Sequence, residues 1–227
     1  MPPALVLFDI DGTLVRRAGP HHRQALVDAV RAVTGVETTT EGVPVHGMLD
    51  PDILTVMMQR AGMPDAAIRQ AMSAIIERAQ DLYFPSVPDL RDKTCPGAHE
   101  LLEALTRRGD VLALVTGNLT RIGWRKLERA GLHHYFRYGA FGEQAADRAG
   151  LAKRAIESAR TDHEVGAGSP ISLVGDAPAD IIAAKANGIR AIAVSTGLSP
   201  REELAAYQPD ILVDGLSELL VANHFDR

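Results

Sequence analysis

Residues 6–14 read VLFDIDGTL, an apolar run that leads directly into two carboxylates. Asp9 and Asp11 stand one residue apart, and in an extended chain such residues project to the same side. Two negative charges this close repel each other, and burying either one costs free energy unless a compensating group is present. The stretch therefore predicts a buried strand that ends at a polar site, where other parts of the chain supply the compensation.

Short apolar runs of the same kind recur along the chain. They are continuous rather than alternating, which is typical of parallel strands that are buried on both faces. Helical patterns lie between them, and several end at glycine, the residue that most readily adopts the left-handed conformation after a helix. The alternation predicts an α/β fold with a doubly wound parallel-sheet (Rossmann-like) core. The predicted strands are 4–8, 111–116, 171–175, 191–195 and 210–214, and the predicted helices between them are 98–108, 119–130, 151–160 and 178–187.

One segment departs from this alternation. Between residues 16 and 92 the sequence has no convincing pattern of a buried strand and shows only helical patterns. We therefore expect an inserted all-α cap domain, with the sheet domain formed by the residues on either side of it. The predicted cap covers residues 16–91 with helices at 21–34, 52–61 and 65–83, and the predicted core covers residues 1–15 and 92–227.

Composition narrows the class of protein. The chain has 227 residues, 46% of them apolar, and a formal net charge of −5, which gives no support to nucleic-acid binding. Its one cysteine, Cys95, excludes a disulfide within the chain and favours the reducing cytoplasm. No apolar run is long enough for a signal peptide or a membrane span. We expect a cytoplasmic protein with neither nucleic acid nor membrane as a partner, and its oligomeric state, monomer or homodimer, is open.

Acidic residues follow two of the predicted strands. Asp9 and Asp11 end the first, and Asp176 and Asp180 follow the run at 171–175. Sites in open α/β sheets form at the carboxyl ends of the strands, so these acids are expected to lie together. Several carboxylates in one place need a cation, and oxygen ligands suit Mg²⁺, which commonly meets a phosphate group.

Small and hydroxylated residues at the same strand ends fit a phosphate. Gly12, Gly117 and Gly175 would let the backbone approach a bulky anion, while free N–H groups and the Thr116 hydroxyl could bind it. Asn118 is a candidate for the same role and equally for capping the following helix. Together with the acids, this pattern predicts phosphoryl transfer.

The two acids of the first strand can take separate roles. Asp9 can act as a nucleophile that forms an aspartyl-phosphate, since carboxylate nucleophiles are an established covalent strategy. Asp11 can protonate the leaving oxygen and later accept a proton from water.

Three motifs resemble those of the haloacid dehalogenase-like superfamily. They are DxDGT at 9–13, the Thr116 of LVTGN, and GDxxxD at 175–180. The chain is similar to the phosphoglycolate phosphatase-like subgroup with a type-1 helical cap, and the insertion falls where that cap belongs. The resemblance implies Mg²⁺ held by the Asp9 carboxylate, the Asp11 backbone carbonyl and Asp176, with Asp180 as a further ligand or a support. Asp11 disfavours dehalogenase chemistry, because that branch lacks the second aspartate.

The family also has a basic residue before or at the start of the helix that precedes GDxxxD. Arg148 and Lys153 are both candidates, and the resemblance favours Arg148 because it lies in the approach to the helix. The chemistry asks only for a fixed positive charge beside the aspartyl-phosphate, which either residue could supply.

These observations predict a Mg²⁺-dependent phosphatase acting on a small phosphorylated metabolite, with phosphoglycolate as the first guess by resemblance. A phosphosugar mutase would share every core residue and differ in its cap. A non-catalytic binding protein of the same fold would be expected to have lost Asp9 or Asp176. The histidine pairs at 21–22 and 133–134 are expected at the surface. Asp50 is expected either to cap the helix that follows it or, as the resemblance to capped relatives allows, to face the substrate.

Overall fold

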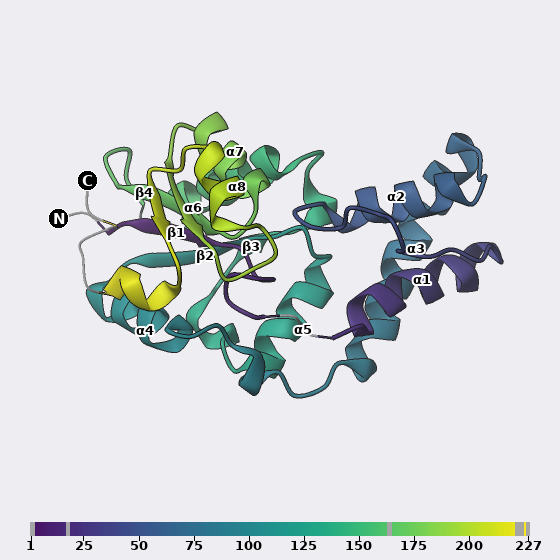
Figure 1. Ribbon diagram of the computed structural model, residues 1–227, viewed down its shortest axis with the longest axis horizontal. Coiled ribbons are helices and arrows are strands. Elements are labelled where there is room, and N and C mark those ends of the chain that lie inside the picture. Colours follow the sequence, from purple (N-terminus) through teal and green to yellow (C-terminus); the bar gives the residue numbers. More distant parts are fainter. Residues whose placement is uncertain (1–2, 17–18, 163–164, 221–224, 226–227) are drawn as a thin grey trace.

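The computed structural model describes residues 3–16, 19–162, 165–220 and 225. Its centre is an all-parallel, six-stranded sheet in the order β3-β2-β1-β4-β5-β6 (Figure 1). The first strand lies between β2 and β4 and pairs with both along its whole length. The strands are β1 (Leu5–Phe8), β2 (Val111–Val115), β3 (Gly139–Ala140), β4 (Ile171–Gly175), β5 (Arg190–Val194) and β6 (Ile211–Val213).

The central position of β1 explains its composition. Leu5 and Leu7 belong to one apolar cluster, whereas Val6 and Phe8 belong to the other. Side chains alternate between the faces of a sheet, so the two clusters lie on its opposite sides. All four side chains are fully buried. A strand with no exposed face must be apolar at every position, which is the pattern seen in the sequence.

Helices cover both faces of the sheet. The cluster that contains Val6 and Phe8 includes apolar side chains of α4 and α5, and the cluster that contains Leu5 and Leu7 includes those of α6, α7 and α8. The predicted doubly wound α/β core is thus confirmed. These helices are α4 (Ala98–Arg108), α5 (Thr120–Ala130), α6 (Arg148–Asp162), α7 (Pro178–Ala186) and α8 (Arg201–Ala206), and the short 3₁₀ helices are η1 (Arg91–Lys93), η2 (His133–Tyr135), η3 (Gly142–Gln144) and η4 (Leu216–Leu220).

Three further helices form the insertion between β1 and β2: α1 (His21–Thr34), α2 (Asp50–Arg60) and α3 (Asp65–Ser86). They lie beside the sheet rather than on either face, and α1 packs along α3 (Figure 1). Helix α3 runs through Pro85, past the predicted end at residue 83, because a proline in the last turn removes only one late backbone hydrogen bond. The domain boundaries at residues 16 and 91 stay a prediction.

Two elements were not predicted from the sequence. Strand β3 is two residues long, and its extended conformation depends on pairing with Leu114 and Val115 of β2. Helix α8 has six residues and a single buried side chain, Leu204. Neither segment is long enough to show a periodic apolar pattern.

Gly97 and Gly109 flank helix α4 and allow a matched test of packing. Both have positive φ, +82° and +85°, which strains any other residue. A Cβ atom at Gly97 would also collide with the backbone of Ser217, whereas at Gly109 it would meet nothing within 4 Å among the described residues. We expect Gly109→Ala to lower the free energy of unfolding by about 1 kcal/mol and Gly97→Ala to lower it by about 3 kcal/mol, since overpacking is added. Urea denaturation measures both, and equal losses would contradict this packing.

Candidate active site

A cavity of about 1010 Å³ lies where the carboxyl ends of the strands face the inserted helices. Its walls come from both parts of the chain, including Leu26 of α1 and Ile53 of α2. Most of the residues that the sequence predicts for the site line it, namely Asp9, Asp11, Gly12, Thr116, Gly117, Asn118, Arg148 and Asp176.

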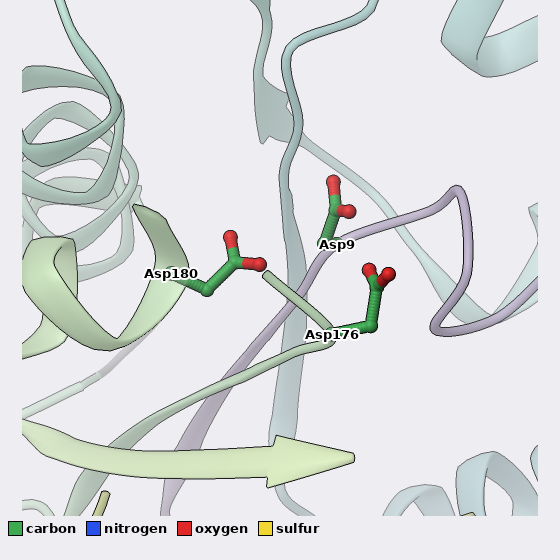
Figure 2. A group of neighbouring side chains, drawn as sticks. All are labelled: Asp9, Asp176 and Asp180. Atoms are coloured by element: carbon green, nitrogen blue, oxygen red, sulfur yellow. The ribbon is translucent and has the colours of Figure 1, made fainter. Parts of the chain in front are cut away.

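Three buried carboxylates meet at this edge of the sheet. Asp9 follows β1, Asp176 follows β4, and Asp180 lies in the first turn of α7 (Figure 2). One oxygen from each lies within 4.8 Å of the others. The side chains are almost inaccessible, and the described residues provide no hydrogen-bond partner for Oδ2 of Asp176 or Oδ1 of Asp180. Hard oxygen ligands with unsatisfied lone pairs fit a divalent cation at this point.

Electrostatics point the same way. Burial and the negative charges of Asp9 and Asp180 raise the pKa of Asp176 well above its ordinary value. Burial likewise raises the pKa of Asp180, and the Asp9 charge adds to it, although Arg148 opposes the shift. The protein alone therefore compensates these charges incompletely, and a bound cation would favour their ionised forms.

Three glycines make room for these acids. A Cβ atom at Gly12 or Gly197 would collide with the Asp176 carboxylate, and one at Gly175 would collide with Asp180. Gly12 also has φ of +85°, which turns the chain after Asp11. Glycine at these positions is thus required by the approach of backbone to carboxylate.

Arg148 is the buried cation of the cluster. Its Nη1 atom donates to Oδ1 of Asp9 at 3.0 Å and to the Val115 carbonyl at 3.2 Å, and it lies 3.5 Å from Oδ1 of Asp180. Burial alone would lower the pKa of Arg148, but the charges of Asp180 and Asp9 raise it overall. Lys153, the other candidate, has a side chain that is 70% exposed and lies 4.0 Å from Glu157. The structure brings Arg148, and not Lys153, to the carboxylates.

The Thr116-Gly117-Asn118 turn connects the sheet with the inserted helices. The Asn118 side chain donates to Oγ1 of Thr116 at 2.7 Å and to Oδ2 of Asp11 at 2.8 Å. A Cβ atom at Gly117 would collide with the carbonyl oxygen of Met48, and the Gly117 carbonyl accepts from the Asp50 N–H. Glycine at position 117 thus leaves room for the chain that leads into α2. The sequence suggested a different reason for this glycine, namely the close approach of an anion.

Asp50 does not cap its own helix. The residue before it, Leu49, is the N-cap, and the Asp50 carboxylate instead accepts from the backbone N–H of Leu119 at 2.8 Å. The same carboxylate is 2.8 Å from Nε2 of His22. The expected surface position of His22 is therefore wrong, because its ring is held between Asp50 and the core, whereas His133 and His134 are exposed as expected.

Lys126 is a pocket residue that the sequence reasoning missed. It is buried, and its Nζ lies 2.5 Å from Oδ2 of Asp11 and 2.6 Å from Oδ1 of Asn118. Although burial acts to raise the pKa of Asp11, the Lys126 charge and the hydrogen bonds from Lys126 and Asn118 lower it overall. The available signal was a lysine on the apolar face of α5, four residues after Ile122 and directly before Leu127.

Known proteins share this fold. The family model of haloacid dehalogenase-like hydrolases matches residues 3–188. A phosphoglycolate phosphatase of Vibrio parahaemolyticus is 30% identical over 95% of this chain and 94% of its own. The structure of a predicted phosphoglycolate phosphatase from Haemophilus somnus aligns with a TM-score of 0.68 at 21% identity over 96% of each chain. The structure of a β-phosphoglucomutase from Clostridium difficile aligns with a TM-score of 0.69 at 15% identity over 96% of this chain and 93% of its own.

A doubly wound sheet with acids gathered at its carboxyl edge is typical of α/β enzymes. The match over most of its length is more specific: the chain belongs to the haloacid dehalogenase-like hydrolases, in the subgroup that is similar to phosphoglycolate phosphatases. The family and the enzyme class predicted from the sequence are confirmed. None of the helices that the structure describes combines the length and the apolar character needed to cross a membrane.

The positions of Arg148 and Lys153 lead to a direct comparison. We expect Arg148→Met to lower kcat for p-nitrophenyl phosphate about 100-fold, because it removes a buried donor beside Asp9. Lys153→Met should leave kcat within about twofold, since exposed ion pairs contribute little. A larger loss of kcat in the Lys153 variant would contradict the assignment of Arg148 as the basic residue of the site.

Proposed function

We propose that the protein is a Mg²⁺-dependent phosphatase that hydrolyses a small phosphomonoester through an aspartyl-phosphate on Asp9. The observation that supports this most is the placement of Asp9. Its carboxylate ends the central strand, faces the cavity, accepts from Arg148 and lies within the group of acids that fits a cation. A carboxylate in such surroundings is poised to attack phosphorus rather than to donate a proton.

The reaction that these residues support has two steps. In the first, an oxygen of Asp9 forms a bond to phosphorus, the ester P–O bond breaks, and Asp11 gives its proton to the departing alcohol. In the second, water attacks the same phosphorus, Asp11 takes the proton of that water, and the Asp9–phosphorus bond breaks to release inorganic phosphate. Arg148 and the Thr116 hydroxyl are proposed to bind the non-bridging phosphate oxygens, with the backbone of Gly12, Gly117 and Asn118 nearby.

The acids would hold the metal. The Asp9 and Asp176 carboxylates and the Asp11 carbonyl are the proposed ligands, and Asp180 supports them from the adjacent turn. Bound Mg²⁺ would offset the repulsion between phosphate and carboxylates and polarise the phosphoryl group. The all-oxygen ligand set and the phosphate substrate support the proposal of Mg²⁺.

The inserted helices are proposed to act as a cap over the site. The two connections near residues 15–17 and 91–96 would be its hinges, and residue 17 lies outside the described residues. Where they are described, the connections pair with each other: the Arg16 N–H donates to the Lys93 carbonyl at 2.7 Å, and the Cys95 N–H donates to the Leu14 carbonyl at 2.9 Å. Hinges tied together in this way would move as one unit and exclude water on closure.

The substrate class follows from the relatives. Similar proteins include phosphoglycolate phosphatases, so a phosphoglycolate-like metabolite is the proposed substrate. We place the reaction in the cytoplasm, with neither nucleic acid nor membrane as a partner. A phosphosugar mutase is the second candidate, since β-phosphoglucomutases share the fold. Trapping the aspartyl-phosphate and offering either water or a sugar phosphate would separate the two. The presence of both Asp9 and Asp176 argues against a binding protein without catalysis.

The assignment of the nucleophile is tested by Asp9→Asn. We expect it to lower kcat for small phosphomonoesters with Mg²⁺ by more than about 1000-fold, because the amide cannot form the acyl phosphate. A screen of phosphorylated metabolites identifies the substrate, and circular dichroism checks that the variant is folded. Activity near the wild-type level in the folded variant would exclude Asp9 as the nucleophile.

The metal site has a readout that does not depend on activity. We expect Mg²⁺ to raise the melting temperature of the wild-type protein, because the ion binds the folded state only. Asp176→Asn should abolish this response while the metal-free variant melts no lower than the metal-free wild type, since a neutral amide replaces one of three crowded, buried acids. A variant that keeps the full Mg²⁺ response would remove Asp176 from the ligand set.

A further inference from the structure

The ammonium group of Lys126 has a partner for each of its three protons. Nζ lies 2.5 Å from Oδ2 of Asp11, 2.6 Å from Oδ1 of Asn118 and 3.1 Å from Nδ1 of His22. Its side chain is 2% exposed, and burying an ammonium costs several kcal/mol unless it is paired and hydrogen-bonded. Such a complete set of partners fixes the position of the cation, and in turn the cation constrains its partners.

The charge of Lys126 determines the tautomer of His22. A charged lysine only donates hydrogen bonds, so Nδ1 of His22 must accept from it. The ring proton is then on Nε2, which donates to Oδ2 of Asp50 at 2.8 Å. The same Asp50 oxygen accepts from the backbone N–H of Leu119. A continuous chain of hydrogen bonds thus runs from α2 through α1 to α5 and ends on Asp11.

The geometry at Asp11 shows what this chain can do. Lys126 and the Asn118 amide both donate to the same oxygen, Oδ2. Two donors on one oxygen fix the rotation of the carboxylate, so the proton transfers fall to the other oxygen, Oδ1. The Asp11 side chain is 42% exposed and lines the cavity, so its carboxyl group is accessible to a bound substrate.

We propose that Lys126 is a positioning residue for Asp11, and that His22 and Asp50 make this positioning depend on the docked cap. The inference rests on the proposed function, in which Asp11 gives a proton to the leaving oxygen and later takes one from water. Lys126 borders the cavity, but its three protons are engaged by Asp11, Asn118 and His22, so its proposed role is exerted through Asp11. It holds Oδ2 so that Oδ1 is aimed at both of these proton transfers.

A double-mutant cycle tests the proposal with p-nitrophenyl phosphate, whose good leaving group keeps Asp11→Asn measurable. We expect Lys126→Met to lower kcat about 10- to 100-fold, as removal of a supporting contact does, with little change in KM. In the Asp11→Asn background, the same substitution should cause no further loss, because the residue acts through Asp11. An equal fold-loss of kcat in the wild-type and Asp11→Asn backgrounds would overturn the proposal, and so would a change in KM without a change in kcat.

Further variants separate this role from a general effect on folding. Lys126→Arg retains the charge and should recover part of kcat, whereas Lys185→Met, at an exposed lysine of α7, is the matched control and should match wild type. If Lys126→Met does not fold, His22→Ala takes its place, with the same expected loss of kcat and the same cycle with Asp11→Asn. An unchanged kcat in folded His22→Ala would overturn the coupling to the cap. A wild-type protein that hydrolyses no phosphomonoester with Mg²⁺ would instead overturn the proposed function.

Discussion

The repulsion among three buried carboxylates is the constraint on which the rest of the structure depends. Asp9 lies far along the chain from Asp176 and Asp180, and Arg148 is the cation that contacts Asp9 and Asp180 directly. Such a group is stable only if the backbone is held rigidly around it, because a small displacement leaves a charge uncompensated. The central strand with no exposed side chain provides that rigidity. The packing of the sheet thus maintains a group of buried carboxylates that by itself destabilises the folded state, as functional sites commonly require.

Much of the fold could be predicted because the strands are buried on both faces. Four residues of continuous apolar sequence at β1 are sufficient to identify a strand when a glycine or an acid ends it. The order of the strands then places the ends of β2, β1 and β4 side by side, so that the residues after them meet. The elements that were missed, β3 and α8, owe their conformation to neighbours and not to their own pattern.

The limits of prediction at the site have a different physical origin. Arg148 and Lys153 are five residues apart on one helix. At 3.6 residues per turn, five residues rotate by roughly 500°, which is one full turn and about 140° more, so the two side chains point in different directions. Choosing between them requires knowledge of which face of α6 packs on the sheet at its first turn. Lys126 and His22 were missed because their contacts join segments about a hundred residues apart. Charge on an apolar helix face is a signal for such contacts, but it does not identify the partner.

In the proposed mechanism, the inserted helices support the chemistry as well as covering the site. Asp50 binds the backbone at Leu119 and, through His22, reaches the lysine that holds Asp11. The sheet provides the proposed nucleophile and the acids proposed to hold the metal, whereas the orientation of the proposed acid and base draws on both parts of the chain. Water reaching an open site would therefore find Asp11 without its full set of supports. A substrate that brings the helices into contact with the sheet would complete these supports, and in the proposed mechanism recognition of the organic group would then be a condition for efficient proton transfer.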